Sequence, residues 1–200
     1  MSAEQMLTLF GALSLAILTP GPAIIATVQA AFQRGRAHAM PYAMGLAFGA
    51  SLWCLMALAG LAVVFRLNPL LFVSLKVFGG FYLLWFAWAL WRASTDELPA
   101  PAGGVRRGFL GGIALNLSNP KPALFYATLI LSVFPNPLGH VQQAAVFGLC
   151  LATEVFWYGL VAIGMSTAAM RLRYFSARFW IDRAAAAAMA ALGLILILNH

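Results

Sequence analysis

Two short stretches decide the fold of this chain: "LTPGPAI" at residues 18–24 and "SNPKPAL" at residues 118–124. Both contain the pattern Pro-x-Pro-Ala, and the two copies lie one hundred residues apart. Each copy falls inside an apolar run, where proline is costly because it removes a backbone donor and its ring clashes with the carbonyl four residues back. The repeated pattern therefore predicts two broken helices at corresponding places in the chain.

The composition predicts that these breaks lie in a membrane. Hydrophobic residues make up 63% of the chain and charged residues 8%, which is too little polar surface for a soluble domain of 200 residues. A helix needs about 20 apolar residues to cross a hydrocarbon core of about 30 Å. Six runs are long enough: 7–32, 42–64, 70–91, 108–134, 144–165 and 184–198. We expect an all-α integral membrane protein whose residues 1–200 form a single transmembrane transporter domain.

The segments between these runs hold most of the charges, prolines and exposed glycines, so we interpret them as connections. They include "STDELPAPAGGVRR" at residues 94–107 and "RLRYFSARFWIDR" at residues 171–183. Arg66 is the only arginine or lysine in a connection that follows an even-numbered run. Nine arginines lie in the connections after the first, third and fifth runs: Arg34, Arg36, Arg92, Arg106, Arg107, Arg171, Arg173, Arg178 and Arg183. By the positive-inside rule these connections are cytoplasmic, and both termini are extracytoplasmic in a prokaryotic inner membrane. The net charge of +7 is then a topology signal and does not indicate a nucleic-acid partner.

The spacing of the two motifs predicts an internal repeat. Three runs accompany the first motif and three the second, and since three is odd, the second set crosses the membrane in the opposite direction. We expect inverted repeats at about 1–95 and about 105–200, with the first and fourth helices broken. Secondary transporters with this architecture bind solute near the midplane, where the repeats meet. The alternative is that the prolines only kink helices whose neighbours fill the gap.

The two breaks supply the candidate substrate site. Their prolines free the carbonyls of Ala16, Leu18, Asn116 and Ser118, which suit an ammonium group, while the positive N-terminal end of a half-helix suits a carboxylate. The candidate substrate-binding residues are Thr19, Pro20, Gly21, Pro22, Asn116, Asn119, Pro120 and Lys121.

Two ionisable residues lie near the centres of the fourth and fifth runs. Lys121 and Glu154 would each cost several kcal/mol if isolated there, so such residues pair with each other or face a cavity. If they do not pair, we assign Lys121 to a substrate carboxylate and Glu154 to a substrate ammonium or to a coupling proton. Glu154 is the only acid in any of the six runs. Lys76 is a lesser candidate, because its long side chain can reach the outer interface.

With these residues the sequence resembles the lysine exporter superfamily, and most of all its homoserine and threonine resistance branch (LysE/RhtB). The resemblance rests on "TPGP", "KVFGGFYLLWFAW" and "NLSNPKPALF" and on an acidic residue in the fifth run, where aspartate is expected in place of glutamate. It implies export of amino acids or close derivatives, driven by the proton gradient, with no cofactor. The matching positions are Pro20, Gly21 and Pro22 in the first motif, Asn119, Pro120 and Lys121 in the second, and Glu154.

Other functions are weighed by the groups they need. A channel needs a continuous polar lining, and an enzyme needs a catalytic or metal-binding cluster that this sequence lacks. A heavy-metal exporter of the same superfamily and a non-transporting scaffold remain as alternatives. Cys54 and Cys150 fall in separate runs, which favours apolar packing over metal binding.

Two pairs of glycines are spaced for close helix packing. They are Gly45-x-x-x-Gly49 and Gly108-x-x-x-Gly112, and small residues at this spacing let helix backbones approach each other. We expect these surfaces to serve either internal packing or a homodimer.

Overall fold

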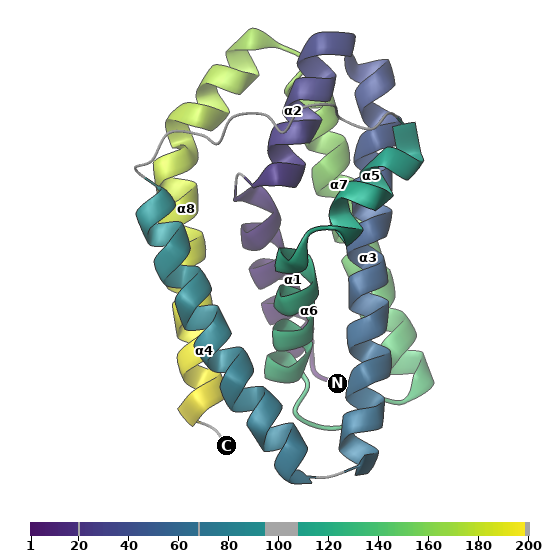
Figure 1. The fold of residues 1–200 in the computed structure, drawn as a ribbon, viewed down its shortest axis with the longest axis vertical. Coiled ribbons are helices and arrows are strands. Elements are labelled where there is room, and N and C mark those ends of the chain that lie inside the picture. The colour runs from purple at the N-terminus through teal and green to yellow at the C-terminus, as the bar shows by residue number, and fades with distance from the viewer. Residues whose placement is uncertain (20, 68, 95–107, 199–200) are drawn as a thin grey trace.

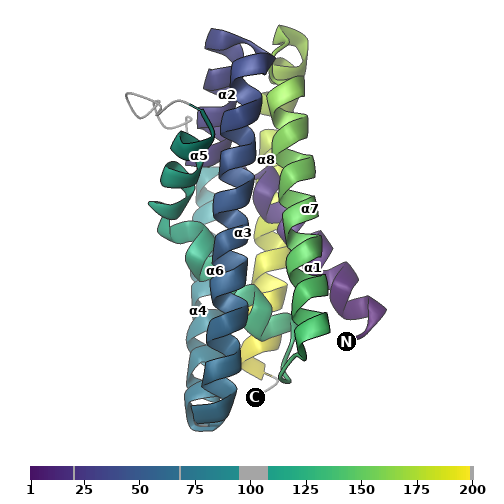
Figure 2. The same ribbon diagram turned by 90° about the vertical axis from the view of Figure 1, so that its right-hand side faces the viewer.

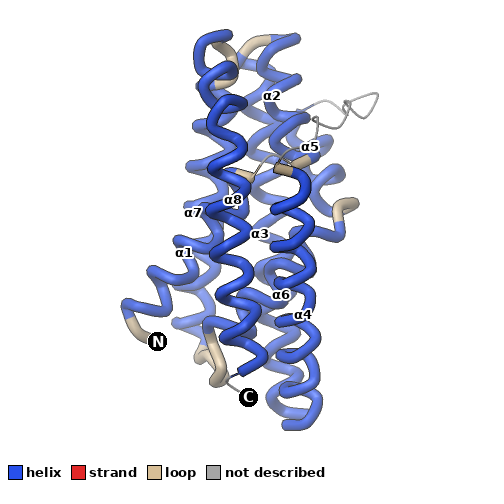
Figure 3. The backbone as a smooth tube through the Cα atoms, turned by 90° about the vertical axis from the view of Figure 1, so that its left-hand side faces the viewer, coloured by secondary structure: helices blue, strands red, loops and turns tan. Residues whose placement is uncertain are grey.

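The computed structural model describes residues 1–19, 21–67, 69–94 and 108–198, and this part of the chain is helical throughout, without strands (Figures 1 and 3). The helices are α1 (Ala3–Leu18), α2 (Pro22–Arg34), α3 (Arg36–Leu67), α4 (Pro69–Ala93), α5 (Gly108–Leu117), α6 (Pro120–Val133), α7 (His140–Gly164) and α8 (Ala168–Leu198).

Both predicted helix breaks are confirmed. The helix α1 ends at Leu18 and α2 begins at Pro22, while α5 ends at Leu117 and α6 begins at Pro120. Proline is tolerated at the first position of a helix, where its missing N–H would have no partner in the helix anyway. Across the first break the direction of the chain changes by 57°. Pro20 itself lies outside the described residues.

In the described part of the chain, fewer than six helices are long and apolar enough to cross a membrane by themselves. Within the described residues, Arg36–Gly60, His140–Gly164 and Ala168–Leu198 meet both conditions, and α1 with the bent Ala23–Phe32 makes a fourth. The apolar helices Gly108–Leu117 and Lys121–Val133 are shorter. The structure therefore establishes an all-helical membrane architecture with three or four candidate spans.

The prediction of a loop at residues 171–183 is wrong, because α8 runs without interruption through them. Its charges are placed on helical spacing: Arg178 donates from Nε to Asp182 Oδ2 at 3.2 Å, one turn further along. The guanidinium of Arg183 lies 3.5 Å from the centre of the Trp91 ring, and its Nε donates to Ser94 Oγ at 3.1 Å. Asp182 is buried on this long apolar helix, so Glu154 is not the only buried acid in the described part of the chain. The other predicted connection, at residues 94–107, lies outside the described residues beyond Ser94.

The helices form an elongated bundle with the two broken pairs near its middle. On one flank α4 packs against α8, and on the other α3 packs against α5 and α7, with α1 and α6 between the flanks (Figure 1). The two ends of the chain lie toward the same end of the bundle, opposite the connections from α2 to α3 and from α7 to α8 (Figures 1 and 2).

Three of the four predicted glycines serve internal packing between α3 and α5, whereas a Cβ atom at Gly108 would meet nothing within 4 Å. A Cβ atom at Gly45 would collide with the backbone of Phe109, and one at Gly112 would collide with that of Tyr42. At Gly49 the added atom would lie 2.8 Å from Cβ of Asn116. Glycine is required at these three positions because the two helix backbones touch. This close contact brings Asn116 against α3.

Candidate functional site

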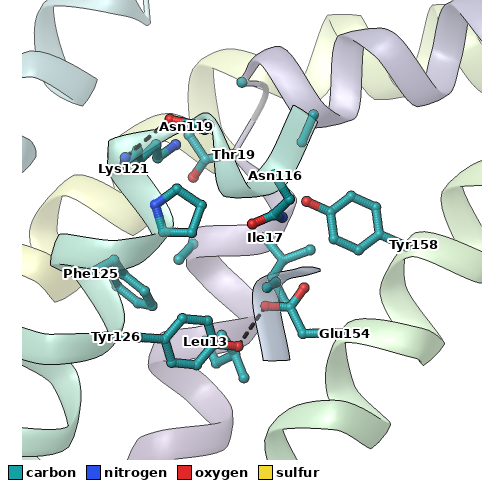
Figure 4. A pocket seen from close by; sticks show the side chains of 15 residues that line it. Leu13, Ile17, Thr19, Asn116, Asn119, Lys121, Phe125, Tyr126, Glu154 and Tyr158 are labelled. Carbon is teal, nitrogen blue, oxygen red and sulfur yellow. Dashed lines mark hydrogen bonds between the residues drawn. The ribbon is translucent and has the colours of Figure 1, made fainter. Parts of the chain in front are cut away.

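The two helix breaks meet at a cavity of about 60 Å³ (Figure 4). One ordered water needs about 10–15 Å³ of such space, so the cavity is large enough for several atoms of a solute. Its walls come from α1, α2, α3, α5, α6 and α7 and the break segments. The lining residues are Leu13, Ala16, Ile17, Thr19, Gly21, Ala23, Ala50, Asn116, Asn119, Lys121, Pro122, Phe125, Tyr126, Glu154 and Tyr158.

Most of the predicted site residues gather here, although they are far apart in the sequence. Those that line the cavity are Thr19, Gly21, Asn116, Asn119, Lys121 and Glu154. Pro20 falls outside the described residues, as do the side chains of Pro22, Pro120 and Lys76. The prolines nevertheless define the helix starts that shape the cavity.

Asn116, the next to last residue of α5, is fixed by its amide. Its Nδ2 donates to the Leu46 carbonyl on α3 at 3.1 Å, which determines that Oδ1 points the other way. The side chain is buried, with 1% of its surface exposed, and Oδ1 has no hydrogen-bond donor. A buried acceptor of this kind is costly, so this atom is prepared for a donor from a ligand or water.

Glu154 on α7 presents a second open acceptor. Tyr126 Oη on α6 donates to Glu154 Oε1 at 2.6 Å. The other oxygen, Oε2, has no partner, although the residue is only 2% exposed. The Tyr126 hydroxyl therefore orients the carboxyl group and leaves one of its oxygens for another group.

Lys121 does not pair with Glu154, so the ion-pair alternative is wrong. Its ammonium lies 4.7 Å from the centre of the Phe86 ring on α4, and a Cβ atom added to Gly21 would lie 3.4 Å from Nζ. Among acids, it interacts at longer range with Asp182. In the close-up view, Lys121 and Glu154 lie at opposite ends of the cavity, with Asn116 between them (Figure 4).

Two of the carbonyls that the prolines were predicted to free are already occupied. Tyr174 Oη on α8 donates to the Leu18 carbonyl at 2.9 Å. The Asn116 carbonyl accepts from the Asn119 backbone N–H at 3.0 Å and from Trp53 Nε1 at 3.4 Å. The open acceptors of the site are therefore side-chain oxygens rather than these two backbone carbonyls.

The sequence interpretation missed the aromatic walls of the cavity, although helical spacing could have found them. Phe125 follows Lys121 by four residues, and Tyr158 follows Glu154 by four, so each aromatic ring shares a helix face with a predicted site residue. Tyr158 is 6% exposed, and its hydroxyl points toward Asn116 (Figure 4).

The groups for a metal site do not come together in the described part of the chain. No set of three or more His, Cys, Asp or Glu side chains there could hold an ion. Cys54 and Cys150 are both buried free thiols.

Comparisons with known proteins agree with the motifs. The family model described as LysE type translocator matches residues 14–200. The "Threonine efflux protein" of Escherichia coli (strain K12) is 29% identical, over 93% of this chain and 94% of that protein. The "Uncharacterized membrane protein YahN" of the same strain is 27% identical, over 82% of this chain and 76% of that protein. No solved structure matches the chain.

The bacterial relatives and the apolar helices together identify the chain as a multi-pass membrane protein. The family match covers both helix breaks and the whole cavity, apart from Leu13 in its wall. The chain belongs to the family of LysE type translocators.

Proposed function

We propose that this protein is a secondary active exporter of amino acids or close derivatives, working as a proton antiporter, with the central cavity as its substrate site. A neutral amino acid such as threonine or homoserine is favoured, because a relative that aligns over nearly the full length is named a threonine efflux protein. The observation that carries the proposal is the distribution of unpaired polar groups around the cavity.

These groups are complementary to a zwitterion. At one end Lys121 lines the cavity, and its ammonium forms no ion pair with a described residue. At the other end Asn116 Oδ1 and Glu154 Oε2 lack donors. An α-amino acid carries a carboxylate and an ammonium, so it supplies an acceptor where the cavity has a donor and donors where it has acceptors. Lys121 then binds the carboxylate. The apolar and aromatic walls exclude water and strengthen both interactions.

Glu154 is the proposed proton-coupling residue. A buried carboxyl group with one oxygen held by Tyr126 and one open can carry a proton when no cation is near and release it when a substrate ammonium arrives. The ionised carboxylate and the neighbouring Asn116 Oδ1 are then the two acceptors available to the ammonium. Exchange of a proton for a substrate cation at one site is the simplest form of antiport.

The proposed architecture has six spans, with α1–α2 and α5–α6 each forming one broken span of an inverted repeat, at about 1–95 and 105–200. Matching breaks and the position of both chain ends at one end of the bundle support it. The basic residues Arg34 and Arg36 lie at the opposite end, which is the cytoplasmic one under this proposal. Reporter fusions at Ala102 and His200 test it: a cytoplasmic His200 or an extracytoplasmic Ala102 contradicts this topology.

Counterflow of a panel of radiolabelled amino acids, with purified protein in liposomes, tests the function. We expect at least one zwitterionic amino acid to accumulate, and we expect Lys121→Gln to reduce that accumulation strongly. Arg173→Gln, which changes an exposed cation outside the cavity, is the matched control. Absence of flux for the whole panel would favour the scaffold alternative, whereas flux of cadmium alone would favour a heavy-metal exporter.

A further inference from the structure

The two helices that begin at the cavity have unequal N-termini. The first four N–H groups of a helix have no partner within it, so an N-terminus can bind an anion unless those groups are otherwise occupied. Under the function proposed above, the substrate carboxylate has two such helix ends to choose from, α2 and α6. Their local sequences, "GPAI" and "NPKP", decide which one is available.

The N-terminus of α6 is closed. Pro120 and Pro122 have no N–H group. The Lys121 N–H donates to Asn119 Oδ1 at 3.0 Å, and the Asn119 N–H donates to the Asn116 carbonyl at 3.0 Å. No backbone donor of the first turn is left for a ligand.

The N-terminus of α2 is open. Its N-cap residue is Gly21, which has no side chain to cap the helix, and only Pro22 lacks an N–H. The N–H groups of Ala23 and Ile24 make no hydrogen bond within the described part of the chain; the first helical bond here is from Ile25 to the Gly21 carbonyl, at 2.9 Å. Ala23 and Gly21 both line the cavity.

A cation lies against this open end. The Lys121 ammonium is 3.4 Å from the position that a Cβ atom of Gly21 would occupy. Positive charge is unfavourable at the N-terminus of a helix, where the aligned peptide dipoles already place partial positive charge. Asp182 interacts with Lys121 only at longer range, and its Oδ2 is held by Arg178. Ala23, which carries one of the two free N–H groups, and Lys121 both line the cavity, and an anion bound at this helix end would stabilise the N–H groups and the ammonium.

The opposite wall supplies the second part of the site. Asn116 Oδ1 and Glu154 Oε2 are buried and lack donors, and Figure 4 shows Asn116 between Lys121 and Glu154. An anion bound at α2 therefore leaves its own cationic group near these two oxygens. An α-amino acid carries both of the groups that this arrangement accepts.

We propose that the N-terminus of α2, and not that of α6, binds the carboxylate of the substrate together with Lys121, and that Asn116 Oδ1 accepts a hydrogen bond from its ammonium. The absence of a side chain at Gly21 keeps the carboxylate position open. The proposal rests on the proposed function and adds an orientation for the substrate.

The test copies the α6 sequence into α2. Ile24→Pro gives α2 the Pro-x-Pro start with which α6 begins, and so removes one of the two free N–H groups. Ile24→Ala shortens the same buried side chain but keeps the N–H, so it is the matched control. Each variant is assayed in liposomes by displacement of radiolabelled L-threonine, or of the best substrate of the wild-type panel. The competitors are that amino acid and its amide, which keeps the ammonium but lacks the carboxylate.

We expect Ile24→Pro to weaken binding of the amino acid at least about tenfold relative to Ile24→Ala, as expected for loss of a hydrogen bond to a charged group, and to leave binding of the amide nearly unchanged. An equal effect on both competitors, or no difference between the two variants, overturns the proposal. If Ile24→Pro does not fold, Gly21→Ala decides by the same ratio, because the added methyl group occupies the carboxylate position. Failure of the wild type to exchange any amino acid refutes the proposed function instead.

Discussion

The two helix breaks share a sequence pattern and differ in what holds them. At the first break, the Leu18 carbonyl is bound by Tyr174 from α8, far away in the sequence. At the second break, the Asn119 side chain and the Asn116 carbonyl bind the backbone N–H groups of Lys121 and Asn119 locally. Two further hydrogen bonds tie Asn116 to Leu46 and Trp53 of α3. A helix end held by a distant helix can respond to movement of that helix, whereas the start of α6, which is capped by its own residues, keeps its shape.

The residue before the first proline of each helix explains the difference. Asn119 is among the best N-cap residues because its side-chain oxygen accepts from the helix start, and Gly21 has no such group. Two nearly identical motifs therefore produce one closed helix end and one open end. The two breaks are similar in backbone path, and they differ in whether the N-cap side chain occupies an N–H group of the helix.

The largest effect is expected at Glu154, which lines the cavity from α7. Glu154→Gln keeps the shape and the contact with Tyr126 but fixes the group as neutral, so we expect it to abolish uphill export driven by a pH gradient. Exchange at equal pH should be spared, because the glutamine side chain keeps an acceptor oxygen and Asn116 Oδ1 still accepts from the substrate ammonium. Transport into liposomes with and without an imposed gradient measures both modes.

Glu4→Gln, the same change at an exposed acid of α1, is the control and should behave as wild type. Undiminished uphill transport by Glu154→Gln would remove this residue from the coupling. Loss of both modes would indicate a role in binding or folding.

The next effect tests whether the first break is needed at all. Replacing Pro20 and Pro22 by alanine restores two backbone donors, so we expect α1 and α2 to join and transport to fall about tenfold or more, a loss of at least about 1.4 kcal/mol. Pro41→Ala is the control, because Pro41 lies inside α3 without breaking it. Normal export by the double variant, measured by counterflow, would show that the prolines are only packing kinks.

A smaller effect should follow from releasing the first break from α8. Tyr174→Phe leaves the Leu18 carbonyl without its donor, which should lower the free energy of unfolding by about 1–3 kcal/mol. Thermal unfolding in detergent measures the change. Tyr82→Phe removes a hydroxyl from half-buried Tyr82 on α4 and is the control; equal stability of the two variants would mean that the Tyr174 bond does not hold the break.

The smallest effect is expected at the second break. Asn119→Ala removes the cap of α6 and should cost about 1 kcal/mol, and Asn119→Asp, which keeps a capping oxygen, should restore most of it. The same unfolding measurement applies. A loss as large as that of Tyr174→Phe would contradict the view that this break is held by several local contacts.

The sequence was sufficient to predict the breaks, because proline acts locally and its consequences do not depend on the rest of the fold. Six of the fifteen residues that line the cavity were also among the predicted site residues: Thr19, Gly21, Asn116, Asn119, Lys121 and Glu154. The sequence failed at residues 171–183, where the density of charge was interpreted as a loop. Opposite charges one turn apart, such as Arg178 and Asp182, pair on a helix and are compatible with it. That this segment is helical became clear only from the structure, where Arg183 packs on Trp91.

The cap residues Gly21 and Asn119 distinguish the two helix ends in the sequence, but only the structure shows that no other described side chain reaches the first N–H groups of α2. Whether a backbone N–H is free depends on which side chains reach it, and this required the position of Asn119 relative to Lys121. The occupation of the Leu18 carbonyl by Tyr174 depends on a contact between residues 156 positions apart. Such contacts follow from helix packing, which the hydrophobic pattern constrains only weakly.

The placement of Lys121 and Glu154 in one cavity, without a bond between them, has an electrical consequence. When Glu154 is ionised, its charge and that of Lys121 cancel and a zwitterionic substrate adds none, so the loaded site is neutral. The empty site with Glu154 protonated carries one positive charge. If one proton enters for each amino acid that leaves, the membrane voltage acts on the proton alone, and each 100 mV contributes about 2.3 kcal/mol to export. A cell with no pH difference across its membrane would then still export amino acids, with voltage as the source of energy.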